Sequence, residues 1–305
     1  MAVLHPDMAV ITEAQKHAYS GTTIAEQRAA WGRYTASIAE PPPAGMRVDD
    51  RVLRGDAHDV PVRVYRHRDA AAAAPCVIYM HGGGFMKGDL DSSDPVAWGF
   101  CAQTGATVVS VDYRLTPEHP HPAAFDDCLA VLRHVAAHSG AFGVDPARIA
   151  VVGDSAGGHL AVALCLAARD GIAPPIAAQA VIYTVTGTDM TMPSYVENAN
   201  GFGLTTKACH DYYAMLLPTG EATPYARPAL ATDYRGLPPA FVHSAEFDPV
   251  RDDGRLYASR LALDGVAVTY REARGMIHGF MRARFKGAAA RAEYDAICAF
   301  LRDRL

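Results

Sequence analysis

The sequence lacks the features that direct a chain to a membrane, to nucleic acid or to export. No apolar run approaches the roughly 20 residues that a membrane-spanning helix requires, because Arg, Asp or Gly interrupts the longest candidates. The formal net charge of −5 provides no basic field for nucleic acid or an anionic membrane. Residues 1–20 mix His5, Asp7 and Glu13 with apolar side chains, which is not the pattern of a secretory signal. We therefore expect a soluble, cytoplasmic protein without nucleic-acid or membrane partners.

Motifs for metals and disulfides are also missing. Six cysteines are scattered without a CxxC pair, and most lie in apolar segments, where a thiol packs as a small hydrophobic group. We interpret them as reduced and structural. The thirteen histidines show no HExxH or other compact metal spacing. We expect neither a metal nor a cofactor.

Alternating apolar patterns predict an α/β fold. A chain of 305 residues, 50% of them hydrophobic, is long enough for one large α/β domain with insertions. Segments Arg51–Arg54 and Val60–Tyr65 flank a turn and predict a hairpin. Apolar runs predict strands at Cys76–Met80, Thr107–Val111, Ile149–Val152, Ala178–Tyr183, Ala240–Ser244 and Ala267–Arg271. Helical patterns occur at Pro95–Thr104, Ala123–Ser139, Ala156–Asp170, Val250–Leu263 and Ala288–Leu301. This alternation implies a mostly parallel central sheet with helices on both faces.

Two segments depart from the alternation and predict a helical cap. Residues 1–48 carry amphipathic helical patterns over Met8–Tyr19 and Ile24–Ile38, before the breaker Pro41–Pro43. Residues 186–232 form an insertion far longer than an ordinary connection between a strand and a helix. We expect both segments to pack over the C-terminal edge of the sheet, where open α/β sheets bind ligands. Residues 49–305 would then form the main domain, with the insertion as part of it.

The strongest chemical signal is Gly153-Asp154-Ser155-Ala156-Gly157. This GxSxG pattern directly follows the predicted strand Ile149–Val152 and directly precedes a predicted helix. A nucleophile elbow needs this context, with small neighbours that let the strand and the helix approach each other. The alternative, a glycine-rich turn that holds a phosphate, requires a dinucleotide-binding or Walker-type spacing that is absent here. We therefore predict that Ser155 is a nucleophile.

A second signal is His81-Gly82-Gly83-Gly84-Phe85, which follows the predicted strand Cys76–Met80. An oxyanion-hole loop is expected at this position if Ser155 is the nucleophile. Three glycines remove the side chains from one face of the loop, so that backbone N–H groups can approach a developing negative charge. We assign that role to Gly83, Gly84 and the N–H group of Ala156. A flexible glycine turn is the alternative, which the coincidence with the serine motif disfavours.

A serine nucleophile needs a histidine as base and an acidic residue that holds the histidine. In this arrangement both come after the serine in the sequence, each at the end of a later strand, and the acid precedes the histidine. Asp248 lies beyond the predicted strand Ala240–Ser244, and His278 lies beyond the last predicted strand. Asp248 can also cap the next helix, a role compatible with a place in the triad. The competitors by residue type are Glu246, Asp252, Asp253, His243, His119, His121 and His210.

The stretch Glu118-His119-Pro120-His121-Pro122 has the composition of a metal or acid–base cluster. We interpret it as scaffold, because a rigid proline-rich loop can hold a buried pair of Arg114 and Glu118 without taking part in chemistry. Asp126 and Asp127 fall in the first turn of the following helix, where acidic side chains suit the helix dipole.

Taken together, the motifs resemble the hormone-sensitive lipase family of esterases, the bacterial family IV carboxylesterases. The matching segments, in chain order, are His81–Phe85, Tyr113–Glu118, Gly153–Gly158, Gly236–Ala240, Asp248–Gly254 and His278–Phe280. The departures from the family pattern, Thr116, Val250 and Arg227-Pro228, lie outside the predicted triad and bear on cap packing and substrate choice.

The resemblance implies an α/β-hydrolase fold with a helical cap, and hydrolysis of short- to medium-chain acyl esters through an acyl-enzyme, without a cofactor. It supports a triad of Ser155, Asp248 and His278. It also supports the assigned oxyanion donors, with His81 and Gly82 holding the glycine loop. The implied partner is a small-molecule ester, and a homodimer is a candidate assembly. An amidase, carbamate hydrolase or lactonase with the same triad is the alternative, as is a non-enzymatic ligand-binding homologue, against which His278 argues.

The substrate pocket is the least specific prediction. The candidate residues are Phe85, Tyr183, Tyr195, Phe202, Tyr212 and Met215. Aromatic and thioether side chains of the insertion can line an adaptable apolar pocket, because they fill irregular spaces. They can equally form the interior of the cap, which is the interpretation that we favour for the insertion.

Overall fold

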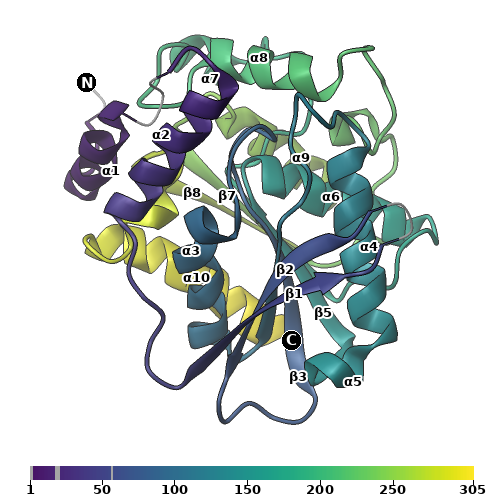
Figure 1. The fold of residues 1–305 in the computed structure, drawn as a ribbon. Coiled ribbons are helices and arrows are strands. Elements are labelled where there is room, and N and C mark those ends of the chain that lie inside the picture. Colours follow the sequence, from purple (N-terminus) through teal and green to yellow (C-terminus); the bar gives the residue numbers. More distant parts are fainter. Residues whose placement is uncertain (1–2, 18–20, 56–57) are drawn as a thin grey trace.

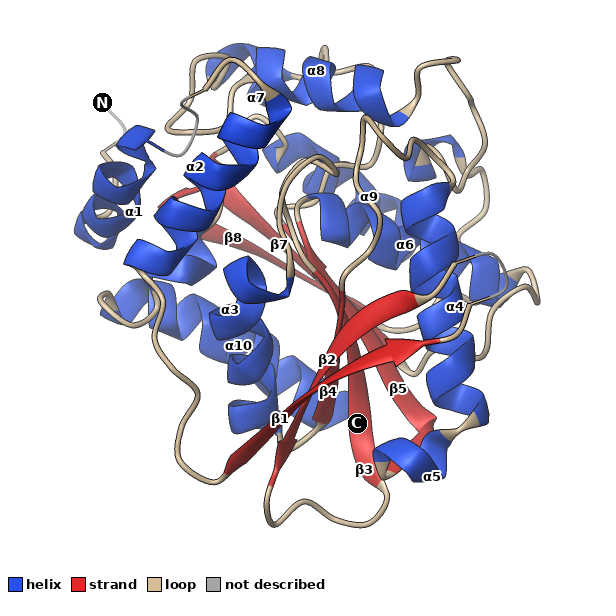
Figure 2. Ribbon diagram, viewed as in Figure 1, coloured by secondary structure: helices blue, strands red, loops and turns tan. Residues whose placement is uncertain are grey.

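The computed structural model describes residues 3–17, 21–55 and 58–305. Eight strands form a single sheet within these ranges, in the order β1-β2-β4-β3-β5-β6-β7-β8 (Figure 2). Strand β2 is antiparallel to both of its neighbours, β1 and β4, whereas the other neighbouring pairs, from β4-β3 to β7-β8, are parallel. The strands are β1 (Met46–Leu53), β2 (Val60–His67), β3 (Ala74–Met80), β4 (Thr107–Val111), β5 (Val144–Asp154), β6 (Ala178–Ile182), β7 (Ala240–Phe247) and β8 (Val268–Ile277). The predicted mostly parallel sheet is confirmed.

Helices cover both faces of this sheet (Figure 1). On one face lie α3 (Leu90–Thr104) and α10 (Ala288–Arg304), where the rings of Phe100 and Tyr294 stack with centroids 4.9 Å apart. On the other lie α4 (Ala123–Ala137), α6 (Ala156–Arg169) and α9 (Arg251–Leu263). The buried apolar side chains accordingly form two clusters, one on each side of the sheet. Burial on both faces explains why a central strand such as β4 has three valines and is buried along its whole length.

The segments predicted as a cap hold the helices α1 (Ala9–Ala14), α2 (Ile24–Ser37), α7 (Pro193–Glu197) and α8 (Thr206–Leu216), with the short 3₁₀ turns η1 (Pro6–Met8), η2 (Gln15–His17) and η3 (Pro228–Leu230). Outside these segments, the short α5 (Ser139–Phe142) packs on α4 and β5, and the 3₁₀ turn η4 (Phe280–Ala283) follows β8. In Figure 1, α2, α7 and α8 gather at one end of the molecule. Helix α2 packs on α3, and α7 packs on α9.

Several boundaries differ from the sequence-based expectation. Strand β5 begins at Val144 instead of Ile149, and β8 ends at Ile277 instead of Arg271. Helix α3 begins at Leu90 rather than at Pro95, because the side chains of Asp89 and Ser92 form a reciprocal capping box before it. Strand β1 begins at Met46, inside the segment 1–48 that was expected to be helical. The helix expected over residues 8–19 is a short α1 between two 3₁₀ turns, and residues 18 and 19 lie outside the described ranges.

Candidate active site

Four loops at the carboxyl ends of parallel strands carry the predicted chemical residues. The first consists of Ser155 alone, the single residue between the end of β5 at Asp154 and the start of α6 at Ala156. Ser155 has φ 56° and ψ −118°, in a region that non-glycine residues rarely adopt, and its N–H group donates to the carbonyl of Ile182 at 2.9 Å. A Cβ atom at Gly157 would collide with the carbonyl oxygen of Met80. The motif therefore forms a strained strand–turn–helix, as its small residues predict.

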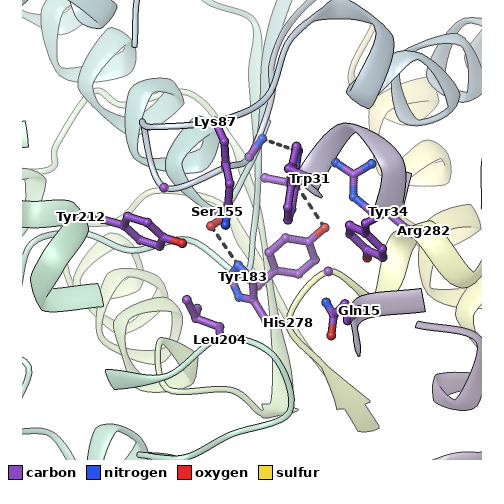
Figure 3. A pocket seen from close by; sticks show the side chains of 15 residues that line it. Gln15, Trp31, Tyr34, Lys87, Ser155, Tyr183, Leu204, Tyr212, His278 and Arg282 are labelled. Carbon is purple, nitrogen blue, oxygen red and sulfur yellow. Dashed lines mark hydrogen bonds between the residues drawn. The ribbon is translucent and has the colours of Figure 1, made fainter. Parts of the chain in front are cut away.

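The structure brings Ser155, His278 and Asp248 together. The Nε2 atom of His278 lies 2.9 Å from Oγ of Ser155, and its Nδ1 atom lies 2.7 Å from Oδ2 of Asp248. These contacts fit an imidazole with its proton on Nδ1, whose Nε2 accepts the serine proton. Figure 3 shows the serine–histidine contact as a dashed line.

Asp248 is completely buried, and its position is fixed by other bonds. Its Oδ1 atom accepts from the N–H group of Val250 at 3.1 Å, so the same carboxylate also caps the turn before α9. The side-chain amide of Asn198, in the insertion, donates to the backbone carbonyl of Asp248 at 3.3 Å. Both oxygens of the carboxylate therefore have donors, which offsets the cost of burying its charge.

The competing acids point elsewhere. Asp253 accepts hydrogen bonds from Tyr195 Oη at 2.6 Å and from Thr186, and Asp252 accepts from the N–H group of Ser194 at 2.9 Å. These two carboxylates join α9 to the insertion. Burial raises the pKa of Asp253, and these hydrogen bonds oppose that shift.

The glycine loop follows β3 and lies against the serine turn. Gly83 has φ 145°, and a Cβ atom there would collide with the carbonyl oxygen of Lys87. The loop therefore needs glycine at this position. His81 is buried, stacks on Tyr113 with ring centroids 4.3 Å apart, and has its Nδ1 atom 3.1 Å from the carbonyl oxygen of Gly82. Burial lowers the pKa of His81.

Asp154, the variable residue of the GxSxG motif, connects the two loops. Its carboxylate accepts hydrogen bonds from Tyr79 Oη at 2.6 Å, from the N–H group of Gly82 at 3.0 Å and from Tyr183 Oη at 3.3 Å. The ring of Tyr183 in turn lies 4.7 Å from the His278 ring, centroid to centroid. Sequence reasoning missed this arrangement, because nothing in the motif shows which distant tyrosines reach the aspartate.

Two cavities meet at Ser155. The first contains about 440 Å³ of space, part of it open to solvent, and is lined by His278 and by polar or aromatic side chains that include Trp31, Tyr34, Lys87 and Arg282 (Figure 3). The second contains about 320 Å³ of space, part of it open to solvent, and its lining is almost entirely apolar: it includes Phe85, Ala156, Val185, Cys209, Tyr213 and Val250. The site therefore offers two chemically different compartments that both border the serine. Gln15, Trp31 and Tyr34, from the weakly patterned N-terminal segment, were not predicted to line it.

The predicted pocket residues fall into two groups. Tyr183 and Tyr212 line the first cavity, and Phe85 and Tyr212 line the second. Tyr195, Phe202 and Met215 are not among the described residues that line either one. Tyr195 is buried against Asp253, and Phe202 is 48% exposed beside Phe247.

The proline-rich loop has different partners from those expected. Arg114 does not pair with Glu118 but with the buried Asp127, at 2.8 Å. Glu118 instead pairs with Arg28 of α2, at 2.6 Å. The loop thus joins the N-terminal segment to the main domain, which no local pattern could reveal.

Within the described part of the chain, no cluster of His, Cys, Asp or Glu has the arrangement of a metal site. None of the described helices combines the length and the apolarity that a bilayer span requires.

The fold and this site define the class of the protein. Residues 77–282 match the family model for the alpha/beta hydrolase fold, and the chain belongs to that family. It is 40% identical over 264 residues to carboxylesterase NlhH of Mycobacterium tuberculosis, an alignment that covers 84% of this chain and 83% of that protein. It is 38% identical to the ethyl acetate hydrolase of Pseudomonas putida, in an alignment that covers 74% of this chain and 73% of that protein.

Solved structures agree with this assignment. The thermostable esterase from Pseudomonas putida ECU1011 superposes with a TM-score of 0.93 at 28% identity, covering 100% of this chain and 98% of that one. The carboxylesterase relatives confirm the resemblance to the hormone-sensitive lipase family that the separated motifs predicted.

Proposed function

We propose that this protein is a serine carboxylesterase that hydrolyses short- to medium-chain acyl esters through an acyl-enzyme. The observation that carries the proposal is the continuous contact from Ser155 Oγ through the His278 ring to the buried Asp248, with distances of 2.9 Å and 2.7 Å. The carboxylesterases among its relatives support the same reaction.

In the first step, Ser155 Oγ forms a bond to the ester carbonyl carbon while its proton passes to Nε2 of His278. The carbonyl oxygen becomes an oxyanion, which we assign to the N–H groups of Gly83, Gly84 and Ala156. Ala156 begins α6, so the positive end of the helix dipole adds to this stabilisation. The bond to the alcohol oxygen then breaks as His278 returns its proton to that oxygen.

In the second step, a water molecule gives a proton to His278 and attacks the acyl carbon. The tetrahedral intermediate collapses, Ser155 Oγ regains the proton, and the carboxylic acid leaves. Asp248 keeps its negative charge throughout and stabilises the imidazolium in both steps.

The two cavities support an orientation for the substrate. The departing alcohol must receive a proton from His278, so we place it in the first cavity, which His278 lines. The acyl chain then occupies the second cavity, whose apolar lining suits a hydrocarbon.

Three further expectations belong to this proposal. Residues 1–48 and 186–232 would act as a cap, which the first cavity supports, since Trp31, Leu204 and Tyr212 from these segments line it. A cytoplasmic location is supported by six cysteines that are all buried and unpaired. A homodimer is the third expectation, and analytical ultracentrifugation would test it.

The first test is hydrolysis of p-nitrophenyl esters from acetate to palmitate, with wild type and Ser155→Ala measured side by side. We expect cleavage that requires Ser155 and is fastest for short chains. Equal turnover by the Ser155→Ala variant would exclude the proposed nucleophile.

A matched ester and amide distinguish an esterase from an amidase on the same triad, because the amide has a poorer leaving group. We expect the ester to be strongly preferred. Labelling of Ser155 by a fluorophosphonate separates both enzymes from a ligand-binding homologue, in which the serine would not be activated.

A further inference from the structure

Tyr183 has a strained backbone beside the triad. It directly follows β6 and has φ 35°, a positive value that bulky side chains rarely adopt. The chain is fixed on both sides of this point: the carbonyl of Ile182 accepts from the N–H group of Ser155 at 2.9 Å, and the N–H group of Tyr183 donates to the carbonyl of His243 in β7. Strain of this kind persists only where the surrounding structure holds it, and it is common at functional sites. The side chain of Tyr183 is therefore a candidate for a functional role.

This side chain packs against the base of the triad. The Tyr183 ring lies 4.7 Å from the His278 ring, centroid to centroid, with the two planes tilted by 54° (Figure 3). The ring of Phe280 meets the Tyr183 ring edge to face at 5.2 Å. Tyr183 and Phe280 are both buried, so neither ring can move without displacing its neighbours in the core. The Tyr183 ring therefore limits how far the His278 ring can turn toward it.

The hydroxyl group of Tyr183 fixes the orientation of its ring. It donates to Oδ2 of Asp154 at 3.3 Å, and Oδ1 of the same carboxylate accepts from the N–H group of Gly82 at 3.0 Å. Burial raises the pKa of Tyr183 well above its ordinary value, and the charge of Asp154 adds to the shift, so the phenol stays protonated and remains a donor. One carboxylate thus holds both the glycine loop and the ring that packs on the base.

We propose that Tyr183 is a positioning residue for the base, whose ring keeps Nε2 of His278 directed at Oγ of Ser155. The contact of 2.7 Å between Nδ1 and Asp248 fixes one atom of the imidazole but leaves the ring free to pivot about that atom. The packed ring of Tyr183 opposes this movement. A general base must lie within hydrogen-bond reach of the proton that it takes, so a displacement of about 1 Å at Nε2 would cost much of the rate. This inference rests on the proposed ester hydrolysis.

The first test separates positioning of the base from contact with the substrate, because Tyr183 also lines the cavity in which we place the alcohol portion. Methyl butyrate and benzyl butyrate share an acyl group and differ in the alcohol, and both depend on the same base. We expect Tyr183→Leu to lower kcat/KM for both esters by the same factor, about tenfold or more, mainly through kcat. Tyr183→Phe keeps the ring and loses one hydrogen bond, so it should stay within about threefold of wild type.

Labelling by a fluorophosphonate separates positioning from a general effect on folding. The end point counts the molecules with a competent site, and the rate constant reports how well His278 activates Ser155. We expect Tyr183→Leu to reach the wild-type end point with a rate constant about tenfold lower.

Tyr257→Leu is the matched control. Tyr257, in α9, is also buried, donates to Oε1 of Gln179 at 2.7 Å, and is not among the described residues that line either cavity. This variant loses a buried, hydrogen-bonded tyrosine away from the triad. It should lower stability while keeping the labelling rate constant and the kcat/KM of wild type.

Three results would overturn the inference. A loss limited to benzyl butyrate would make Tyr183 a substrate contact, and a lowered end point with the wild-type rate constant would make its role structural. A loss in Tyr183→Phe as large as about tenfold would assign the effect to the hydroxyl group rather than the ring, and this variant decides the question if Tyr183→Leu does not fold. Failure of the proposed function gives a different result: wild type would cleave neither ester in a Ser155-dependent manner.

Discussion

The N–H group of Gly82 donates a 3.0 Å hydrogen bond to Oδ1 of Asp154, the residue immediately before Ser155. This bond joins the glycine loop to the serine turn, although 72 positions separate the two residues. This buried carboxylate therefore helps to fix the position of the proposed oxyanion donors relative to Ser155. Preorganised donors account for much of the rate enhancement in acyl transfer, so this bond is expected to matter for catalysis.

Replacing Asp154 with Ala should lower both activity and stability. The variant leaves buried donors of Gly82 and Tyr79 without their acceptor, which should cost about 2 kcal/mol or more in unfolding free energy. We expect kcat for p-nitrophenyl butyrate to fall at least about tenfold, because the glycine loop loses its anchor. Asp154→Asn keeps one oxygen acceptor and should recover part of both losses. Urea unfolding and steady-state kinetics measure the two effects. Unchanged kcat in the alanine variant would show that the loop is positioned without Asp154.

Asp248→Asn should reduce kcat by about 10³- to 10⁴-fold with little change in the fold, since an amide cannot hold the histidine in the required tautomer or stabilise its charged form. Asp253→Asn is the matched control, because it alters a buried aspartate on the neighbouring helix that bonds to Tyr195 and Thr186 instead. It should lower the thermal midpoint with a far smaller effect on kcat. A larger loss of kcat in the Asp253 variant would indicate that Asp253, and not Asp248, is the acid of the triad.

Arg28 offers a test of the N-terminal segment as part of the cap. Its guanidinium donates to the carbonyls of Met86 and Thr116 at 2.8 and 3.0 Å and pairs with Glu118. Arg28→Met should loosen α2 and so displace Trp31 from the cavity wall, raising KM more than it lowers kcat. The control is Arg33→Met, an exposed position on the same helix. The same KM in both variants would argue against a role for this segment in substrate binding.

The carboxylate of Glu293 should make the free energy of unfolding depend on pH. Burial alone would raise its pKa, but hydrogen bonds from His243 and Arg271 outweigh burial and lower the pKa to about 2. A carboxylate with a lowered pKa stabilises the folded state fully at pH values above its pKa in the unfolded state, about 4.5. It loses this contribution as the pH falls toward its folded-state pKa of about 2. Wild type should therefore lose more unfolding free energy than Glu293→Gln between neutral pH and about pH 3, by about 1 to 3 kcal/mol.

Urea unfolding followed by circular dichroism at several pH values measures this difference. Glu13→Gln, at an exposed carboxylate paired with Lys16, should behave as wild type. Parallel pH profiles of wild type and Glu293→Gln would contradict the prediction.

Strand and helix alternation, and the identity of the main chemical groups, could be predicted because the evidence for them is local. The serine motif carries its own strand, turn and helix, and Gly157 is small because the turn needs it to be. The short helix α1 could not be predicted well, since a weak amphipathic pattern does not show where a neighbouring element will end it. Strand β1 was placed too late for a similar reason: an edge strand with mostly exposed residues has no continuous apolar run.

The sequence by itself determined which groups can react and the order in which they occur along the chain. Only the tertiary structure decided which of several acids faces His278, that Asp154 joins two loops, and that Lys87 and Trp31 share a cavity with Ser155. The physical reason is the range of the interactions. Local backbone preferences and hydrophobic periodicity act over a few residues, whereas these contacts form only when the sheet brings the ends of distant strands to one edge.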